Sequence, residues 1–207
     1  MVQDTKQKLL DTAERLFAER GYDATSLRQV IAEAQVNLAA VHYHFGSKEE
    51  LLDQLVANRV VPVNAERMAR LDQLEGEAGR TRPEVAKVLA AFLLPMLDIA
   101  ATHPQFPKLM GRLYAEGRLS SIAQKHFREV VLRFMQALHR ALPGLPEEEL
   151  IWRVHFMIGA MAQTMCGPPV FSEAMAHNTD LGMRIGRLIT FLSGGFRAPA
   201  EQVEEKR

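Results

Sequence analysis

Apolar residues recur at intervals of three and four along nearly the whole chain, whereas alternation of apolar and polar residues is hard to find. Intervals of three and four bring side chains onto one face of an α-helix, while strict alternation is typical of a β-strand. Over residues 4–20, Leu9, Ala13 and Leu16 share such a face, and Gly21 follows as a left-handed stop. The sequence therefore predicts an all-α protein.

Two capping motifs indicate helix starts near the N-terminus. Ser26 with Gln29, and Ser47 with Glu50, have the spacing of a capping box, in which each side chain accepts a hydrogen bond from the backbone of the other residue. We expect a short helix after Ser26, a break before a third helix over 36–43, and a longer helix from residue 47.

The rest of the chain is expected to form a larger helical domain. The charged segment 66–83 is poor in large apolar residues, so we interpret it as a helix end and a surface connection. Pro95 should bend the helical run that contains it. Further helices are expected over 84–101, 104–116, 120–142, 146–165 and 177–192. The predicted organisation is an N-terminal domain (1–46), a larger domain (47–196) and a polar tail (197–207).

Charge and cysteine content narrow the possible classes of protein. The 207 residues carry 25 basic and 25 acidic side chains, so any contact with nucleic acid must be local. The single cysteine, Cys166, excludes an intramolecular disulfide and a four-thiolate zinc site and is typical of a reducing compartment. The N-terminus lacks the apolar core of a signal peptide, and prolines and polar residues interrupt the uncharged run 154–172. We expect a cytoplasmic protein without a membrane span.

The sequence contains no arrangement typical of a catalytic or metal site. His42 and His44 stand two apart, which on a helix points them in different directions, and the other histidines lack ligand spacing. A nucleophile elbow and a phosphate-binding glycine loop are both missing, and Cys166 lies in an apolar stretch that favours packing. The sequence predicts neither an enzyme nor a bound cofactor or metal.

Two short helices joined by a tight turn, over residues 26–43, match a helix-turn-helix, whose second helix enters the major groove of DNA. Acidic residues, which would repel phosphates, are absent between Gln35 and Ser47. Ala39 and Ala40 are small enough for the helix backbone to approach base edges. The alternative is a helical hairpin that only packs a core, since generic helix-turn-helix patterns have many false positives.

The segment 21–52 resembles the DNA-binding domain of TetR-family transcriptional repressors. The matching words lie at 18–22, 25–28, 36, 43–45 and 47–51. By position, the resemblance implies contacts to base edges from Arg28, Asn37, Leu38, Ala39 and Ala40. It implies contacts to phosphates from Thr25, Ser26, His42, Tyr43, His44 and Lys48. Two residues depart from the family pattern, because Gln35 stands where many members have glycine at the turn and His42 replaces a frequent tyrosine.

Apolar side chains surround the expected helix 146–165 and are dense in the last helix, where Gly182 and Gly186 stand four apart. A helix that is apolar on all sides is typically buried, here against its own subunit and a partner. We therefore expect these two helices to form a homodimer interface, and the resemblance to TetR-like proteins implies an intersubunit four-helix bundle. Such a dimer requires palindromic DNA, because it presents two reading helices about a two-fold axis. The alternative is a monomer with one buried central helix.

The larger domain is also rich in Met and Phe, which line adaptable apolar cavities or fill cores. In TetR-like proteins this domain encloses an inducer, so the resemblance implies a ligand site. The apolar candidates are Phe92, Met96, Phe106, Met110, Phe134, Trp152 and Phe156. The polar candidates are Arg112, Tyr114, His155 and Gln163. Segments 37–41, 45–48 and 152–157 are similar to the PsrA-like subgroup of fatty-acid-responsive repressors, which implies a long-chain fatty acid or acyl-CoA as inducer.

These features together predict a repressor that binds palindromic operator DNA as a homodimer and is released by a hydrophobic inducer. The helix from residue 47 would act as the lever between the DNA-binding and ligand-binding domains. Two alternatives stay open. One is a TetR-like regulator that responds to another hydrophobic or drug-like ligand, and the other is a helical adaptor or lipid-carrying protein that does not bind DNA.

Overall fold

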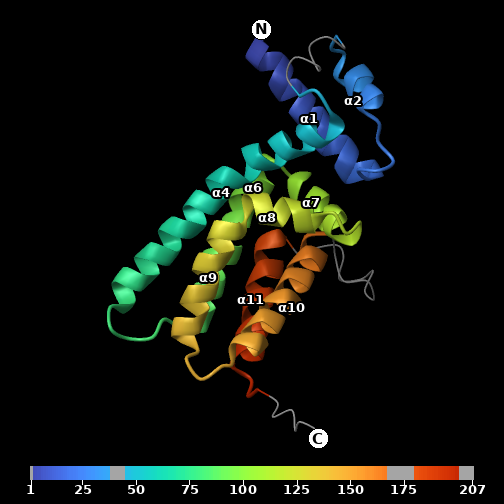
Figure 1. Ribbon diagram of the computed structural model, residues 1–207. Coiled ribbons are helices and arrows are strands. Elements are labelled where there is room, and N and C mark those ends of the chain that lie inside the picture. The colour runs from blue at the N-terminus through green and yellow to red at the C-terminus, as the bar shows by residue number, and fades with distance from the viewer. Residues whose placement is uncertain (1, 38–44, 167–179, 201–207) are drawn as a thin grey trace, which may run out of the picture. The chain divides into compact units, whose positions relative to one another are not determined.

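A computed structural model describes residues 2–37, 45–166 and 180–200, and these residues contain helices and no β-strand, which confirms the all-α prediction (Figure 1). The first helices are α1 (Val2–Arg20), α2 (Leu27–Ala34), α4 (Lys48–Ala78), α5 (Val85–Leu93) and α6 (Pro95–Thr102). They are followed by α7 (Phe106–Ala115), α8 (Leu119–His126), α9 (Arg128–Ala141), α10 (Glu147–Cys166) and α11 (Leu181–Arg197). Most of the expected third helix lies outside the described residues.

Local capping chemistry explains where α1 and α2 begin and end. Helix α1 stops at Gly21, whose φ of 95° is readily available only to glycine. Ser26 caps α2 in a complete capping box, since its Oγ accepts from the Gln29 amide at 3.2 Å and Gln29 Oε1 accepts from the Ser26 amide at 2.7 Å. Helix α2 ends at Gln35, a left-handed residue with φ 53° and ψ 44°. The stop at Gly21 and the capping box of Ser26 agree with the sequence prediction.

Helix α4 corrects the expected connection at 66–83, because it continues without a break to Ala78 and even includes Pro62. Apart from the buried Arg67, the charged residues of this segment are exposed or half-buried, and Arg70 pairs with Glu66 at 2.6 Å. Its inner side buries Leu71 and Leu74. The prediction was therefore wrong for residues 66–78, and the connection begins only after the helix ends at Ala78.

Two other expected helices are each divided in two. The run 84–101 is interrupted at Leu94, where α5 ends and Pro95 begins α6, so the proline does more than bend one helix. The run 120–142 is interrupted at Phe127, between α8 and α9. The last helix begins after Asp180, whose Oδ1 accepts from the Met183 amide at 2.8 Å, and ends at Arg197 instead of residue 192.

The described residues form two compact units. The first contains those within 1–65, 96–128 and 165–166, and the second contains those within 66–95, 129–164 and 180–200. The core of the first unit includes Leu9, Leu16, Phe17, Leu51, Leu55, Phe106, Leu109 and Leu113. The core of the second unit includes Leu71, Leu89, Leu93, Phe134, Leu138, Ile185 and Phe196. The grouping of 96–128 with the N-terminal helices was not anticipated by the expected boundary at residue 46.

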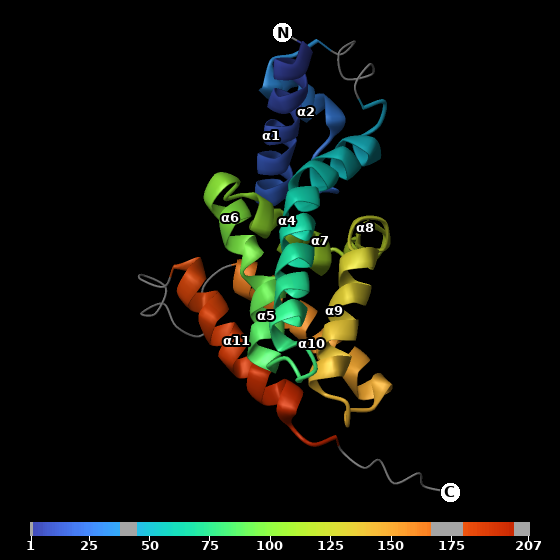
Figure 2. The ribbon, with the colours of Figure 1, turned by 90° about the vertical axis from the view of Figure 1, so that its left-hand side faces the viewer.

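In the second unit, α11 packs along α5 (Figure 2). The stretch Val85–Thr102 has the length and hydropathy of a membrane-spanning helix, and half of it is buried inside the protein. Burial of this kind is typical of the core helices of a water-soluble protein, which pass the same test of length and composition.

Candidate DNA-binding site and apolar surfaces

Helix α2 and its two ends position the predicted DNA contacts that the structure describes. Arg28 on α2, Ser26 at its N-cap and Asn37 beyond its C-terminus are all exposed. Thr25 differs, because its side chain is fully buried and its Oγ1 donates to the carbonyl of Gly21 at 2.8 Å. The structure therefore assigns the Thr25 hydroxyl to the turn between α1 and α2, with no exposed surface for a phosphate.

The remaining predicted DNA contacts include most of the expected third helix. Leu38, Ala39, Ala40, His42, Tyr43 and His44 lie outside the described residues, so their roles stay predictions. Helix α4 begins directly after this segment, with Ser47 Oγ accepting from the Glu50 amide at 3.0 Å, as its capping spacing predicts.

Lys48, the last predicted phosphate contact, is half-buried and its Nζ lies 4.0 Å from the centre of the Tyr22 ring. Burial lowers the pKa of Lys48. Burial also raises the pKa of Tyr22 to about 12, helped by the hydrogen bond of 3.1 Å that its hydroxyl donates to Glu49. The tyrosine ring thus orients the ammonium group at the start of α4.

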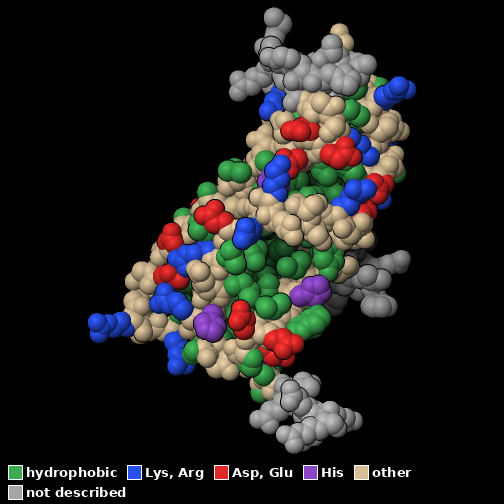
Figure 3. All heavy atoms as spheres, viewed as in Figure 1, with side chains coloured by type: hydrophobic (Ala, Val, Ile, Leu, Met, Phe, Trp, Pro, Cys, Tyr) green, Lys and Arg blue, Asp and Glu red, His purple; other side chains and the backbone are tan. Residues whose placement is uncertain are grey.

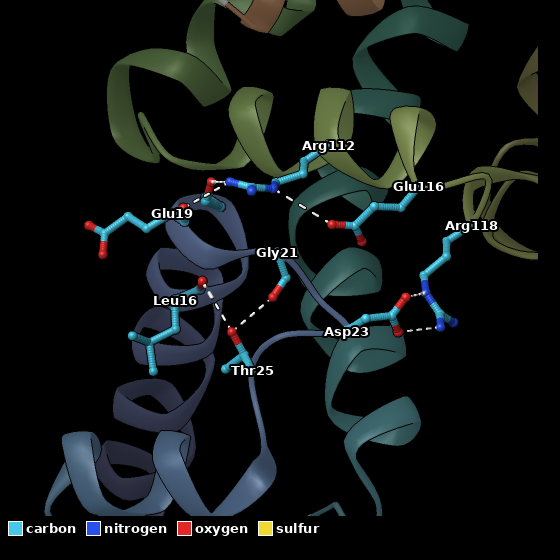
Figure 4. A network of polar contacts seen from close by, with 9 residues as sticks. Leu16, Glu19, Gly21, Asp23, Thr25, Arg112, Glu116 and Arg118 are labelled. Carbon is cyan, nitrogen blue, oxygen red and sulfur yellow. Dashed lines mark hydrogen bonds and ion pairs between the residues drawn. The ribbon is translucent and has the colours of Figure 1, made fainter.

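A polar network connects the α1–α2 turn to α7 and to the residues that follow it (Figure 4). Arg112 Nη1 donates to the backbone carbonyls of Glu19 at 2.8 Å and Ala18 at 3.2 Å. Arg118 pairs with the carboxylate of Asp23. Arg112 was predicted as a polar contact for a ligand, whereas the structure places its guanidinium against the end of α1.

An open hollow of about 350 Å³ lies beside this network, within the first unit. Its walls come from the α1–α2 turn, the first turns of α4, and α8 with the residue before it. The lining is mixed in charge, with the carboxylates of Glu49, Glu50 and Asp53 and the cations Arg118 and Lys125. Asp53 is already held by Lys125 at 2.6 Å and by a ring nitrogen of His126 at 2.8 Å.

A buried ion pair joins α4 to α1. Arg59 Nε donates to Glu14 at 2.8 Å and its Nη2 donates to Asp11 at 2.6 Å, and the Arg59 and Glu14 side chains are both 5% exposed. Desolvation raises the pKa of Glu14 even though Arg59 lowers it. His103 stands close enough to Asp11 and Glu14 for the three residues to share an ion, but Arg59 already supplies the positive charge.

The predicted ligand contacts are divided between the two units. Phe92 and Phe134 are buried in the second unit with ring centres 4.4 Å apart, whereas Met96 and Phe106 are buried in the first. Met110 is half-buried, also in the first unit. The exposed members of the set are Tyr114, Trp152, His155, Phe156 and Gln163.

Arg67 is a buried residue of the second unit that the sequence analysis did not indicate. It lies on α4 with its guanidinium 4.1 Å from the centre of the Phe92 ring, and its Nε donates to the Phe92 carbonyl at 2.8 Å. Desolvation lowers the pKa of Arg67 to about 9. The signal that could have found it is the spacing of four between Arg67 and Leu71, which was hidden by the interpretation of 66–83 as a connection.

Helices α10 and α11 run antiparallel and carry an exposed apolar face, which we call the α10–α11 face. Arg153 near the start of α10 donates to the carbonyl of Phe196 at 3.0 Å, and Arg184 near the start of α11 donates to the carbonyl of Thr164 at 2.7 Å. Hydrophobic side chains also gather on the surface in the region of α9 and α10 (Figure 3). The exposed fractions are Ile151 53%, Trp152 51%, Phe156 62%, Met183 47% and Phe191 74%.

Comparison with known proteins identifies the family. A model described as bacterial regulatory proteins of the tetR family matches residues 9–55. A second, described as a tetracyclin repressor-like C-terminal domain, matches residues 90–195, about half of the chain. The chain belongs to the TetR family. This confirms the family resemblance, and because TetR-family proteins are transcription regulators, it also confirms that the chain is not an enzyme.

One curated relative matches only a short segment of this chain. IcaR of Staphylococcus aureus strain Newman, a negative transcriptional regulator of the biofilm operon icaADBC, is 39% identical over 51 residues. That match covers 25% of this chain and 27% of IcaR, so the chain spans little more than a quarter of the length of this curated relative.

Two solved structures show the same fold over most of the chain. SmeT, the repressor of the Stenotrophomonas maltophilia multidrug efflux pump SmeDEF, has a TM-score of 0.63 at 22% identity, covering 94% of this chain and 91% of SmeT. A Clostridium perfringens protein proposed to regulate fatty acid metabolism has a TM-score of 0.63 at 15% identity, covering 91% and 97%. At these identities the likeness supports the fold alone.

Proposed function

We propose that this TetR-family chain is a repressor that binds palindromic operator DNA. The observation that carries the proposal is the exposure of Arg28 on α2 and of Asn37 just after the left-handed turn at Gln35. Both residues lie inside the segment 9–55 that the tetR family model matches. Arginine and asparagine are suited to read base edges with paired hydrogen bonds. The similarity to IcaR, a negative regulator, favours repression over activation. Such work on DNA would place the protein in the cytoplasm.

The α10–α11 face supports a homodimer. Aromatic side chains dominate it, with the rings of Trp152 and Phe156 stacked at a centroid distance of 5.8 Å. Exposed apolar side chains clustered on adjoining helices mark an interaction surface, and aromatic residues contribute large buried areas at such interfaces. A second copy related by a two-fold axis would cover this face and place two DNA-reading helices about 34–36 Å apart on DNA.

A hydrophobic inducer would act by shifting the spacing of the two DNA-reading helices. Helix α4 supports this role as lever, because it begins next to the DNA-binding segment and continues unbroken to Ala78. A ligand can change operator affinity only if it binds more tightly to one arrangement of the dimer than to the other. Linkage then requires operator and ligand to weaken each other's binding equally.

A long-chain fatty acid or acyl-CoA is the ligand class that we favour. Support comes from the second unit, where the buried Phe92 ring packs on Phe134 and lies beside the guanidinium of Arg67, a group suited to a carboxylate or phosphate. The alternative is a drug-like hydrophobic ligand, since the same apolar side chains would also pack against such a molecule.

Selection from a library of random DNA duplexes tests the central proposal. The chain should enrich a palindrome and bind it as a dimer with strong salt dependence. Failure to enrich any palindrome at low salt would contradict it. Mass spectrometry of the organic extract of purified protein tests the ligand class, where a copurified long-chain acyl compound supports our assignment and a different bound molecule contradicts it.

A further inference from the structure

We propose that Arg112 is a positioning residue, which couples α7 to the DNA-binding helices by clamping the end of α1. This inference rests on the proposed DNA-binding function and assigns a specific contact to its control. The clamp consists of Arg112 on α7, Glu116 at the C-cap of α7 and Arg118 just beyond it, and it acts on residues 18–25 (Figure 4).

The contact satisfies groups that α1 cannot satisfy by itself. The last four carbonyls of an α-helix have no partner within the helix, and α1 ends at Arg20. Arg112 donates to two of these carbonyls, those of Ala18 and Glu19. A cation at this place also interacts favourably with the negative end of the helix dipole. The guanidinium therefore holds α1 more specifically than apolar packing between α1 and α7 would.

Gly21 allows α7 to approach the main chain closely. A Cβ atom at this residue would lie 2.7 Å from Glu116 Oε1 and 3.3 Å from Arg112 Nε. The carboxylate of Glu116 in turn pairs with Arg112 at 3.6 Å. The absence of a side chain thus serves the left-handed turn and also the fit of the clamp.

The turn between α1 and α2 links the position of the end of α1 to the start of α2. Thr25 Oγ1 donates to the carbonyl of Gly21 at 2.8 Å, and the next residue is Ser26, the N-cap of α2. On the other side, Arg118 pairs with Asp23 and lies 4.6 Å from the centre of the Tyr22 ring. A displacement of α7 relative to α1 would therefore move the start of α2, on which Arg28 is carried.

The test compares Arg112→Ala with Lys108→Ala, which removes an exposed positive charge from the same helix. Each full-length variant is titrated with the duplex that the wild-type chain selects, over a series of salt concentrations. We expect Arg112→Ala to weaken binding roughly tenfold, which equals about 1.4 kcal/mol. The slope of log affinity against log salt should stay unchanged, since a positioning residue contacts no phosphate. Lys108→Ala should bind as wild type.

Three outcomes of this titration would overturn the proposal. They are wild-type affinity in Arg112→Ala, a salt slope reduced by about one, which would indicate a direct phosphate contact, and an equal loss in Lys108→Ala, which would indicate a general charge effect.

Hydrogen exchange of the full chain without DNA gives a second, independent measurement. The amides of residues 18–25 should exchange faster in Arg112→Ala than in wild type and Lys108→Ala, and unchanged exchange there would contradict the clamp. If Arg112→Ala does not fold, Arg112→Lys serves instead, because it keeps the charge but loses the planar pair of donors. A wild-type chain that selects no duplex would refute the proposed function, while the exchange experiment would still decide whether the clamp exists.

Discussion

Removing Arg59 should destabilise the protein far more than removal of a surface charge. Arg59 and Glu14 are each 5% exposed, and the Arg59 Nε–Glu14 Oε2 distance is 2.8 Å. This ion pair offsets the desolvation of the Glu14 carboxylate, which lies buried on α1. Breaking a buried pair by removing one partner typically costs about 3–5 kcal/mol, against about 0–1 kcal/mol for an exposed pair. For a chain of this length we therefore expect Arg59→Met to lower Tm by about 10 °C.

The pH dependence of this loss identifies its cause. Burial already raises the pKa of Glu14 above its ordinary value of 4.5, and loss of Arg59 should raise it further. The stability contributed by a carboxyl with a raised pKa is fully present below its ordinary pKa and is lost as pH rises through its folded-state pKa. The deficit of Arg59→Met should therefore be largest near neutral pH and should shrink as pH falls toward 4.5.

The measurement is urea unfolding followed by circular dichroism at one fixed protein concentration, because a dimer links stability to concentration. The double variant Arg59→Met with Glu14→Gln is the control, and it should recover much of the loss because no buried charge is left. A deficit below about 1 kcal/mol at neutral pH, or a deficit independent of pH, would refute the buried-charge account.

Three further substitutions test the proposed function and one local feature. Phe191→Asp should convert the dimer to a monomer in light scattering and reduce operator affinity, because it places a charge on the α10–α11 face; an unchanged dimer would exclude this residue from the interface. Arg28→Ala should relax base preference at one operator position and cost about 1–3 kcal/mol, and a uniform loss over all sequences would indicate a phosphate contact instead. Gln35→Gly should raise the free energy of unfolding by up to about 1 kcal/mol, since glycine adopts the left-handed φ of 53° without strain, and a destabilised variant would contradict that view.

Short-range features of the fold were predictable from sequence because their causes are local. The capping box of Ser26 and Gln29 joins residues three apart, and the left-handed turns at Gly21 and Gln35 follow from the ends of their own helices. The same local words carried the family resemblance, since the TetR family model matches residues 9–55. The exposure of Arg28 and Asn37 also follows from where α2 begins and ends.

The roles of several long side chains were decided only by tertiary structure. Arg112 bonds to a carbonyl 94 residues away, and Arg67 lies across from Phe92 on a separate helix. Sequence periodicity reports which face of a helix is apolar, but it does not report which other helix covers that face.

The sequence by itself therefore determined the helical class, the helix ends in the DNA-binding segment and the family. Tertiary structure decided the unbroken length of α4 and the contact of Arg112 with α1. The physical reason is that helix propensity and capping act over three or four residues, whereas burial and the pairing of buried charges depend on which distant segments meet.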